Sequence, residues 1–406
     1  MTPQTRAEVL LKRLVDSPSP TTSQSSVRST HAILAEELEA LGFIVEWIRD
    51  PSGKTDDLLV AEKPGTQTTS PSAAEHNDRF ITMVSHVDTV LSPTESGPLR
   101  VDPQGRLLGA GIIDNKGGLA VLLGSLNLYL PKNPSHEFGF RVVSSPDEEN
   151  GSTAWHPIYR EIGTRSMAVL GFEPSLEDGS IITSRRGNRW YDIQFTGIEA
   201  HAGRCRGEEL NAAHEATLAI AELLRLQADL REKFPSPAGL GVSLHVGHIE
   251  GGRNRHNVVC GKVHIKLDTR FSTFEQRDLL HERVTAIIET QFQTNNKGQG
   301  LERSWTIVDD CPPFFSGSDR VSAEIVETLL NEIHVLEPDA QFEAAQAGGA
   351  GDVNHMSRPG LLVLDGLGPV GGLMHTVDEF LVRDSLTTRS QALANWYPTL
   401  MKLLMV

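Results

Sequence analysis

Apolar and polar residues alternate along the first part of the chain in a pattern that switches repeatedly between helical and strand periods. In chain order the predicted elements are a helix near 5–16, a helix at 26–41, strands at 43–48, 57–62 and 80–85, a helix near 116–130, a strand near 138–145, a helix near 152–162 and a strand near 167–172. This order predicts an α/β fold with a largely parallel sheet sandwiched by helices. The segment 64–78, rich in Thr, Ser, Pro and Gln, is interpreted as a surface loop.

The pattern changes between about residues 184 and 310. The elements predicted there are strand 189–197, helix 211–228, strands 241–250 and 257–271, helix 274–293 and strand 302–309. A βαββαβ order is that of a ferredoxin-like α+β module. Helix–strand alternation then resumes at 318–334 and 361–365. We therefore expect a catalytic domain formed by 1–183 and 311–406, with 184–310 inserted as a separate domain.

Composition narrows the class of protein. A chain of 406 residues is long enough for two domains. A net charge of −16 without a Lys/Arg-rich stripe argues against nucleic acid as a partner. No apolar run is long enough to span a membrane, and the charged first 20 residues indicate an amphipathic helix instead of a signal peptide. Three widely spaced cysteines, Cys205, Cys260 and Cys311, favour a reducing cytoplasm.

Histidines and carboxylates follow several of the apolar runs. His86 ends one such run and Asp88 follows two residues later, so both side chains point the same way and the carboxylate can hold the imidazole for a metal. Further segments contribute similar residues, namely Asp114, Glu149, Glu173 and His375. Two divalent cations that share one carboxylate need that bridging group and at least two further ligands each. His86 and these four residues satisfy this count, although any one alone could be structural.

Glu148 stands directly before Glu149. Adjacent side chains diverge, so one carboxylate can bind a metal while its neighbour takes a proton from water. The alternative is that Glu148 is a helix-terminal charge favoured by the helix dipole. Glycines around Asp114, including Gly111 and Gly117, allow close approach to a metal, and the segment lacks the Lys-Ser/Thr ending of a phosphate-binding loop.

The inserted module carries polar residues near strand ends. They are Arg185, Arg186, His201, Asn257 and Arg270. Arginine forks suit a carboxylate, and a histidine or asparagine could hold a carbonyl oxygen as it becomes negative. Each of them could equally be an ordinary surface residue.

Taken together, these segments resemble a known family along nearly the whole chain. The motifs are His86-Val87-Asp88-Thr89-Val90, Gly111-Ile112-Ile113-Asp114-Asn115-Lys116-Gly117-Gly118, Asp147-Glu148-Glu149-Asn150-Gly151-Ser152, Phe172-Glu173-Pro174 and Met374-His375-Thr376. They are similar to those of the dinuclear zinc family of glutamate carboxypeptidases, acetylornithine deacetylase, succinyl-diaminopimelate desuccinylase and aminoacylase. The stretches at 183–187, 199–203 and 364–369 are most similar to the glutamate carboxypeptidase (carboxypeptidase G) branch.

The resemblance implies roles for individual residues. It implies two Zn²⁺ per subunit, with Co²⁺ or Mn²⁺ as substitutes. His86, Asp114 and Glu173 would hold one zinc, and Asp114, Glu149 and His375 the other. Asp88 would orient His86, and Glu148 would be the general base.

The resemblance also implies a homodimer formed through residues 184–310. His201 would reach the active site of the partner subunit. Asn257, Arg270 and one of Arg185 or Arg186 would bind the carboxylate or carbonyl of the substrate.

Two segments depart from the pattern of many relatives. The loop Gly348-Gly349-Ala350-Gly351-Asp352 lacks a serine or threonine before its aspartate, and Thr153-Ala154-Trp155 stands where relatives often have a Gly-Ser pair. Both changes leave the metal ligands intact and bear on the substrate.

We therefore expect a metal-dependent hydrolase, a dizinc metallopeptidase that cleaves an amide or peptide bond next to a free carboxylate, as glutamate carboxypeptidases do. The substrate would be a small peptide or an N-acyl amino acid. An N-acyl amino acid deacylase or a dipeptidase of the same family is the alternative. A non-catalytic, metal-stabilised dimer is a further alternative, against which the retention of Glu148 argues.

Overall fold

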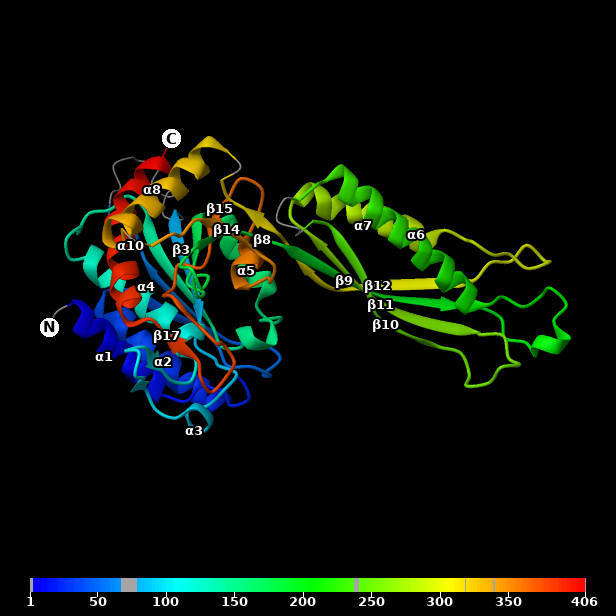
Figure 1. Ribbon diagram of the computed structural model, residues 1–406, viewed down its shortest axis with the longest axis horizontal. Helices are drawn as coiled ribbons and strands as arrows, with labels where there is room; N and C mark the ends of the chain where they lie inside the picture. The colour runs from blue at the N-terminus through cyan, green and yellow to red at the C-terminus, as the bar shows by residue number, and fades with distance from the viewer. Residues whose placement is uncertain (1–2, 67–78, 237–240, 318, 339, 406) are drawn as a thin grey trace. The chain divides into compact units, whose positions relative to one another are not determined.

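The structure is a computed structural model that describes residues 3–66, 79–236, 241–317, 319–338 and 340–405 (Figure 1). Most of the predicted loop at 64–78 lies outside these residues. The chain divides into two compact units. The first unit comprises Met1–Ser184, Phe315–Ala347 and Gly351–Val406, and the second comprises Arg185–Phe314 and Gly348–Ala350.

A six-stranded sheet forms the centre of the first unit. Its order is β1 (Ile44–Ile48), β2 (Leu58–Lys63), β6 (Gly139–Ser145), β3 (Phe80–His86), β7 (Ser166–Gly171) and β15 (Leu362–Leu364). The four strands from β6 to β15 are parallel, and every residue of β3 and β6 is buried, as expected for strands covered on both faces.

One edge of this sheet differs from the largely parallel arrangement expected. β1 and β2 form an antiparallel pair, and β2 also runs antiparallel to β6. The apolar runs predicted both strands but carry no signal for direction. The other four strands are parallel, as predicted for an α/β unit.

The helices of the first unit pack on this sheet and on one another. They are α1 (Pro3–Asp16), α2 (Gln24–Ala40), α3 (Pro93–Ser96), α4 (Gly118–Tyr129), α5 (His156–Thr164), α8 (Arg320–Leu336), α9 (Asp352–Met356) and α10 (Arg383–Leu403). Helix α4 is apolar on nearly all sides and packs against α1 and α10, which explains why its amphipathic signal is weak.

Short strands that the apolar pattern did not predict complete the first unit. A four-stranded sheet has the order β16 (Gly371–Gly372), β17 (Phe380–Leu381), β5 (Leu107–Leu108) and β4 (Arg100–Val101). A three-stranded sheet has the order β13 (Phe314–Phe315), β8 (Ile181–Arg185) and β14 (Ala344–Ala347). The strands β4, β5, β13, β16 and β17 have two residues each and are too short to show a period of two, so sequence alone could not reveal them.

The second unit has the predicted ferredoxin-like order. Its elements are β9 (Gly187–Thr196), α6 (Ala212–Lys233), β10 (Ser243–Gly251), β11 (Lys262–Phe271), α7 (Phe274–Glu289) and β12 (Glu302–Cys311). The strands pair antiparallel in the order β10-β11-β9-β12. Alternate residues pack with α6 and α7 into one apolar core, which leaves the other face of the sheet open and polar (Figure 1).

Helix starts in the second unit follow capping rules. The Asn211 side chain accepts hydrogen bonds from the backbone of Ala213 and His214 at the start of α6. Thr273 caps α7 in the same way. Within the part of the chain that the structure describes, no helix is long and apolar enough to cross a membrane.

Candidate metal and catalytic centre

His86 is the last residue of β3 and is fully buried. Its Nδ1 lies 3.0 Å from the backbone oxygen of Asp88 and 3.2 Å from Asp88 Oδ1. Its Nε2 lies 3.0 Å from Asp114 Oδ1 and 3.7 Å from Glu173 Oε1. The two-residue spacing at the strand end therefore brings Asp88 to one imidazole nitrogen and leaves the other nitrogen facing the acidic residues.

Asp88 makes more contacts than its predicted role required. Its Oδ1 accepts a hydrogen bond from the backbone N–H of Glu148 at 3.1 Å. Its Oδ2 accepts one from Glu149 N–H at 3.2 Å and one from the Thr21 hydroxyl at 2.8 Å. One buried carboxylate thus fixes both the histidine and the turn that carries the adjacent glutamates.

Asp114 lies between the two histidines of the centre. Its Oδ1 is 3.0 Å from His86 Nε2, and its Oδ2 is 3.2 Å from His375 Nε2. The turn that carries it starts after Gly111, whose φ of 62° is left-handed and where a Cβ would lie 2.1 Å from Thr89 Cγ2. Glycine is required there both for the backbone angle and for the close approach.

Glu149 and Glu173 lie on opposite sides of Asp114. Glu149 Oε2 is 3.2 Å from His375 Nε2, which pairs these two residues beside Asp114 Oδ2. Glu173 is near His86 beside Asp114 Oδ1 and accepts a hydrogen bond of 2.9 Å from Asn115. The structure therefore brings together all five residues predicted to bind metal, in two groups that share Asp114.

The donor set fits divalent cations. Nitrogen and oxygen atoms of His86, Asp114 and Glu149 lie within 4.8 Å of one another. Glu149 Oε1 is buried and has no hydrogen-bond partner within the described residues. A buried carboxylate oxygen without a donor is costly, and a cation would satisfy it. Imidazole and carboxylate together are ligands that zinc accepts.

The pKa values of the cluster show the electrostatic cost of assembling these residues. Burial raises the pKa of Glu149 to about 7 and raises that of Glu173 well above its usual range. Burial acts in the same direction on Asp114, but hydrogen bonds from His375 and His86 outweigh it and hold that pKa below its usual range. The hydrogen bond to Asp114 raises the pKa of His375 to about 9. Protons and cations therefore compete for this cluster.

A further acid, Glu379, holds the Asp114 turn and was not predicted. Its carboxylate accepts hydrogen bonds from the backbone N–H groups of Gly111 at 3.1 Å, Ile113 at 2.8 Å and Asp114 at 3.0 Å. Its side chain is buried. Glu379 lies four residues after His375 on the same loop. The one sequence feature that could have pointed to it is its position directly before the apolar Phe380.

Glu148 begins a short 3₁₀ turn, Glu148–Asn150, in the same centre. Its Oε1 is 3.8 Å from the position that a Cβ on Gly351 would take. Asp352 follows and is buried, and it accepts a hydrogen bond of 3.0 Å from the Tyr159 hydroxyl. The loop 348–352, which lacks a serine or threonine, thus brings the backbone of Gly351 and the acid Asp352 close to Glu148, the predicted base.

The other departure from the family pattern has a structural role. Trp155 is completely buried, and its indole N–H donates a hydrogen bond of 2.8 Å to Asp147 Oδ1. Burial raises the pKa of Asp147 to about 6. Trp155 therefore anchors the residue that precedes Glu148.

The catalytic candidate His201 and the four predicted substrate-binding residues belong to the second unit. His201 Nε2 lies 3.2 Å from Asn257 Nδ2, and both side chains are exposed. Arg185 donates to Gly349 O at 3.1 Å, Arg186 to Gly241 O at 2.8 Å, and Arg270 to Asp268 at 2.9 Å. Burial lowers the pKa of Arg186, and the charge of Arg270 adds to this effect.

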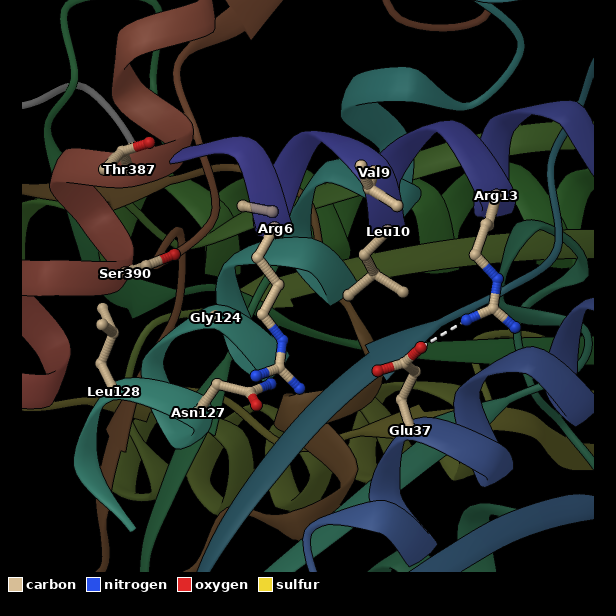
Figure 2. Close-up of a pocket in the computed structure, with 11 residues that line it drawn as sticks. Arg6, Val9, Leu10, Arg13, Glu37, Gly124, Asn127, Leu128, Thr387 and Ser390 are labelled. Carbon is tan, nitrogen blue, oxygen red and sulfur yellow. Dashed lines mark hydrogen bonds and ion pairs between the residues drawn. The ribbon is translucent and has the colours of Figure 1, made fainter. Parts of the chain in front are cut away.

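A cavity of about 470 Å³ in the first unit lies among α1, α2, α4 and α10 (Figure 2). Arg6, Leu10, Asn127, Leu128 and Ser390 are among its lining residues. None of the predicted site residues lines it, so it carries no part of the proposed chemistry.

The chain is similar to a known domain family and to known enzymes. The peptidase dimerisation domain family, M20_dimer, matches residues 183–296. The chain is 28% identical to the succinyl-diaminopimelate desuccinylase of Dechloromonas aromatica over 362 residues, which cover 87% of this chain and 88% of that relative. It is 27% identical to the enzyme of the same name from Shewanella pealeana, over 91% of each chain.

Solved structures share the fold along the whole chain. A tripeptidase from Staphylococcus aureus has a TM-score of 0.69 and 20% identity, covering 98% of this chain and 99% of that one. An M20 family metallo-carboxypeptidase from Sulfolobus solfataricus has a TM-score of 0.65 and 14% identity, with coverage of 98% and 99%. The fold and its relatives define a hydrolase built from an α/β catalytic unit and a dimerisation domain. Residues 183–296 match the peptidase dimerisation domain family, and the chain as a whole is similar to succinyl-diaminopimelate desuccinylases and shares its fold with an M20 family metallo-carboxypeptidase.

Proposed function

We propose that this hydrolase is a dizinc enzyme that cleaves an amide or peptide bond next to a free carboxylate, with glutamate carboxypeptidase-like activity. The observation that supports it best is the position of Asp114, whose two oxygens face His86 and His375 separately. His86, Asp114 and Glu173 would hold one cation, and Asp114, Glu149 and His375 the other. Zn²⁺ is the proposed metal, and Co²⁺ or Mn²⁺ could replace it.

Cations held there would act as Lewis acids toward the substrate carbonyl and toward water. Glu148 would take a proton from the attacking water and later donate it to the leaving nitrogen, so that a carboxylic acid and an amine are released. Asp88 would keep His86 in position through its Nδ1, and it holds the backbone of Glu148 and Glu149 by the hydrogen bonds described above.

The second unit would supply substrate recognition. His201 of one subunit would stabilise the carbonyl oxygen in the site of its partner, as the dimerisation domain supports. Asn257, Arg270 and one of Arg185 or Arg186 would bind the substrate carboxylate or carbonyl. The catalytic domain would comprise 1–183 and 311–406, and the homodimer would form through 184–310. The free Cys205, Cys260 and Cys311 are consistent with a cytoplasmic enzyme.

A second candidate is an N-acyl amino acid deacylase. The names of the two desuccinylase relatives favour it, because removal of a succinyl group is an N-deacylation. Both candidates use the same centre and release an amino acid as the amine. They differ in the acyl group, which is a peptidyl or folyl group for the carboxypeptidase and a simple carboxylic acyl group such as succinyl for the deacylase.

A substrate panel tests the proposal and separates the two candidates. Zinc-loaded protein is offered folyl-glutamate, other γ- and α-linked glutamate peptides, dipeptides, and N-acetyl and N-succinyl amino acids, and the released amine is measured. Release of glutamate from a peptide or folyl conjugate supports the carboxypeptidase. Preference for N-acyl amino acids supports the deacylase. Failure to hydrolyse any member of the panel, with both metals bound, would contradict both.

A further inference from the structure

Asp352 is a buried acid beside the proposed catalytic centre, and the proposed mechanism does not use it. It is the first residue of α9, and its Oδ2 accepts a hydrogen bond of 3.0 Å from the hydroxyl group of Tyr159 on α5. Tyr159 is itself fully buried. A carboxyl group and a phenol are both costly to bury without a partner, so each makes the position of the other tolerable. This hydrogen bond therefore ties the start of α9 to α5.

The start of α9 lies against the side chain of the proposed base. Glu148 Oε1 is 3.8 Å from the position that a Cβ on Gly351 would take, and Gly351 directly precedes Asp352. The electrostatics agree with this geometry. Burial raises the pKa of Asp352 well above its usual range, and the negative charge of Glu148 is the next largest cause. Among the charged side chains, Glu148 is therefore the one that affects Asp352 most strongly.

The turn that carries Glu148 is held at both ends. At its start, Asp88 accepts a hydrogen bond from the backbone N–H of Glu148. At its end, His156 Nε2 lies 2.9 Å from the backbone oxygen of Gly151, and the His156 ring stacks on His355 of α9 with the ring centroids 3.5 Å apart. Helices α5 and α9 therefore meet at the end of this turn, so a shift of α9 would change the surroundings of Glu148.

We propose that Asp352 is a positioning residue for Glu148. By accepting the hydrogen bond from Tyr159, it holds the start of α9, with the backbone of Gly351, against the Glu148 side chain, and so restricts the directions in which this carboxylate can point. The inference rests on the proposed function, in which Glu148 takes a proton from the attacking water. Such a base has to be held closely, because a displacement of about 1 Å can cost roughly 100-fold in rate.

The test measures hydrolysis and zinc content in zinc-loaded protein with a change at residue 352. Asp352→Ala removes the acceptor of the Tyr159 hydroxyl group, so kcat should fall about 10–100-fold. KM and zinc content should stay as in the wild type, because the proposed ligand Glu149 is paired with His375. Asp352→Asn keeps an oxygen that accepts this hydrogen bond and should retain most of the wild-type kcat. Loss of kcat alone, with rescue by asparagine, separates positioning from a general loss of structure.

Two buried tyrosines provide a matched control. Tyr159→Phe should lower kcat in the same direction as Asp352→Ala. Tyr397→Phe also removes a buried hydroxyl group, which lies 2.7 Å from Ser125 Oγ, and should leave kcat unchanged. Crystal structures of the zinc-loaded wild type and of zinc-loaded Asp352→Ala add a readout that needs no turnover. The Glu148 carboxylate should be displaced in the variant, while the five proposed metal ligands keep their positions.

Unchanged kcat in Asp352→Ala, or an unmoved Glu148 carboxylate in its crystal structure, would overturn the inference. Equal losses of kcat in Asp352→Ala and Asp352→Asn would also overturn it, as would loss of zinc together with kcat. Failure of the wild type to hydrolyse any substrate would instead contradict the proposed function, and the two crystal structures would then decide the inference alone. If Asp352→Ala fails to fold, the comparison of Tyr159→Phe with Tyr397→Phe decides.

Discussion

The two units hold their predicted functional residues in very different ways. In the first unit, Asp88 and Glu379 are buried carboxylates that between them accept five backbone hydrogen bonds, from Glu148 and Glu149 in one case and from the Asp114 turn in the other. In the second unit, His201 and Asn257 are exposed, and their side chains lie 3.2 Å apart. The difference indicates that the proposed metal centre is preorganised within one unit, whereas the proposed substrate-binding residues would need a substrate or a partner subunit to complete their contacts.

The largest expected effect concerns the two adjacent glutamates. Glu148→Gln should keep both metals and lower kcat by roughly 10²–10⁴-fold, because the base is lost while the ligands remain. Glu149→Gln should in addition weaken metal binding. Elemental analysis and steady-state kinetics on both variants check this, with the surface change Glu161→Gln on α5 as control. Equal metal loss in the Glu148 and Glu149 variants would show that the roles are assigned wrongly.

Glu379→Gln tests whether metal binding depends on a residue that holds the backbone of the Asp114 turn without being a predicted ligand itself. An amide oxygen is a weaker acceptor than a carboxylate, and an amide cannot accept at both positions, so the Asp114 turn should loosen. Metal affinity should fall roughly 10–100-fold, as is typical when a group that supports a ligand is removed. Competition with a chromogenic chelator measures it. The exposed neighbour Asp378→Asn should behave as wild type, and the account of Glu379 fails if both variants bind metal equally.

The role of the second unit is tested by mixing two inactive chains. A heterodimer of His201→Ala and Glu148→Gln contains one site with both residues intact, if His201 acts across a two-fold interface. Random exchange of equal amounts should then restore roughly a quarter of wild-type activity. Native mass spectrometry verifies that heterodimers form. Heterodimers no more active than either parent would place His201 outside the partner's site.

A smaller effect is expected when the ion pairs of Asp310 in the second unit are removed. Arg189 and Arg277 both donate to Asp310, at 2.9–3.0 Å for Arg189, and these hydrogen bonds outweigh burial and lower the pKa of Asp310. A carboxyl pKa that is lower in the folded state stabilises the protein above the pKa of the unfolded state, and this contribution is lost as pH falls through the acid range. Asp310→Asn should cost about 2 kcal/mol at neutral pH and much less in acid. Urea denaturation at both pH values measures the difference, and a cost that does not change with pH would refute this origin.

The site could be predicted where its residues stand at the ends of strands or among glycines. His86 follows an apolar strand, and Asp114 lies in a glycine-rich segment, so local pattern alone pointed to them. Glu379 gave no such signal, because its importance comes from hydrogen bonds to a segment distant in the sequence. Asp352 follows a glycine-rich loop, but its hydrogen bond to Tyr159, which is also distant in the sequence, could not be predicted. The direction of β1 and β2 was missed for a similar reason, since pairing partners distant in sequence decide it.

The most direct test of the central claim is the number of metals that the catalytic centre binds. The full chain is purified without chelator, loaded with zinc, freed of excess metal and analysed for zinc per chain. Four ligands arranged in two pairs around the shared Asp114 predict two equivalents of zinc per chain at saturation. The variant Asp114→Ala should lose both. Saturation of the parent chain at one equivalent or none would contradict a dinuclear centre.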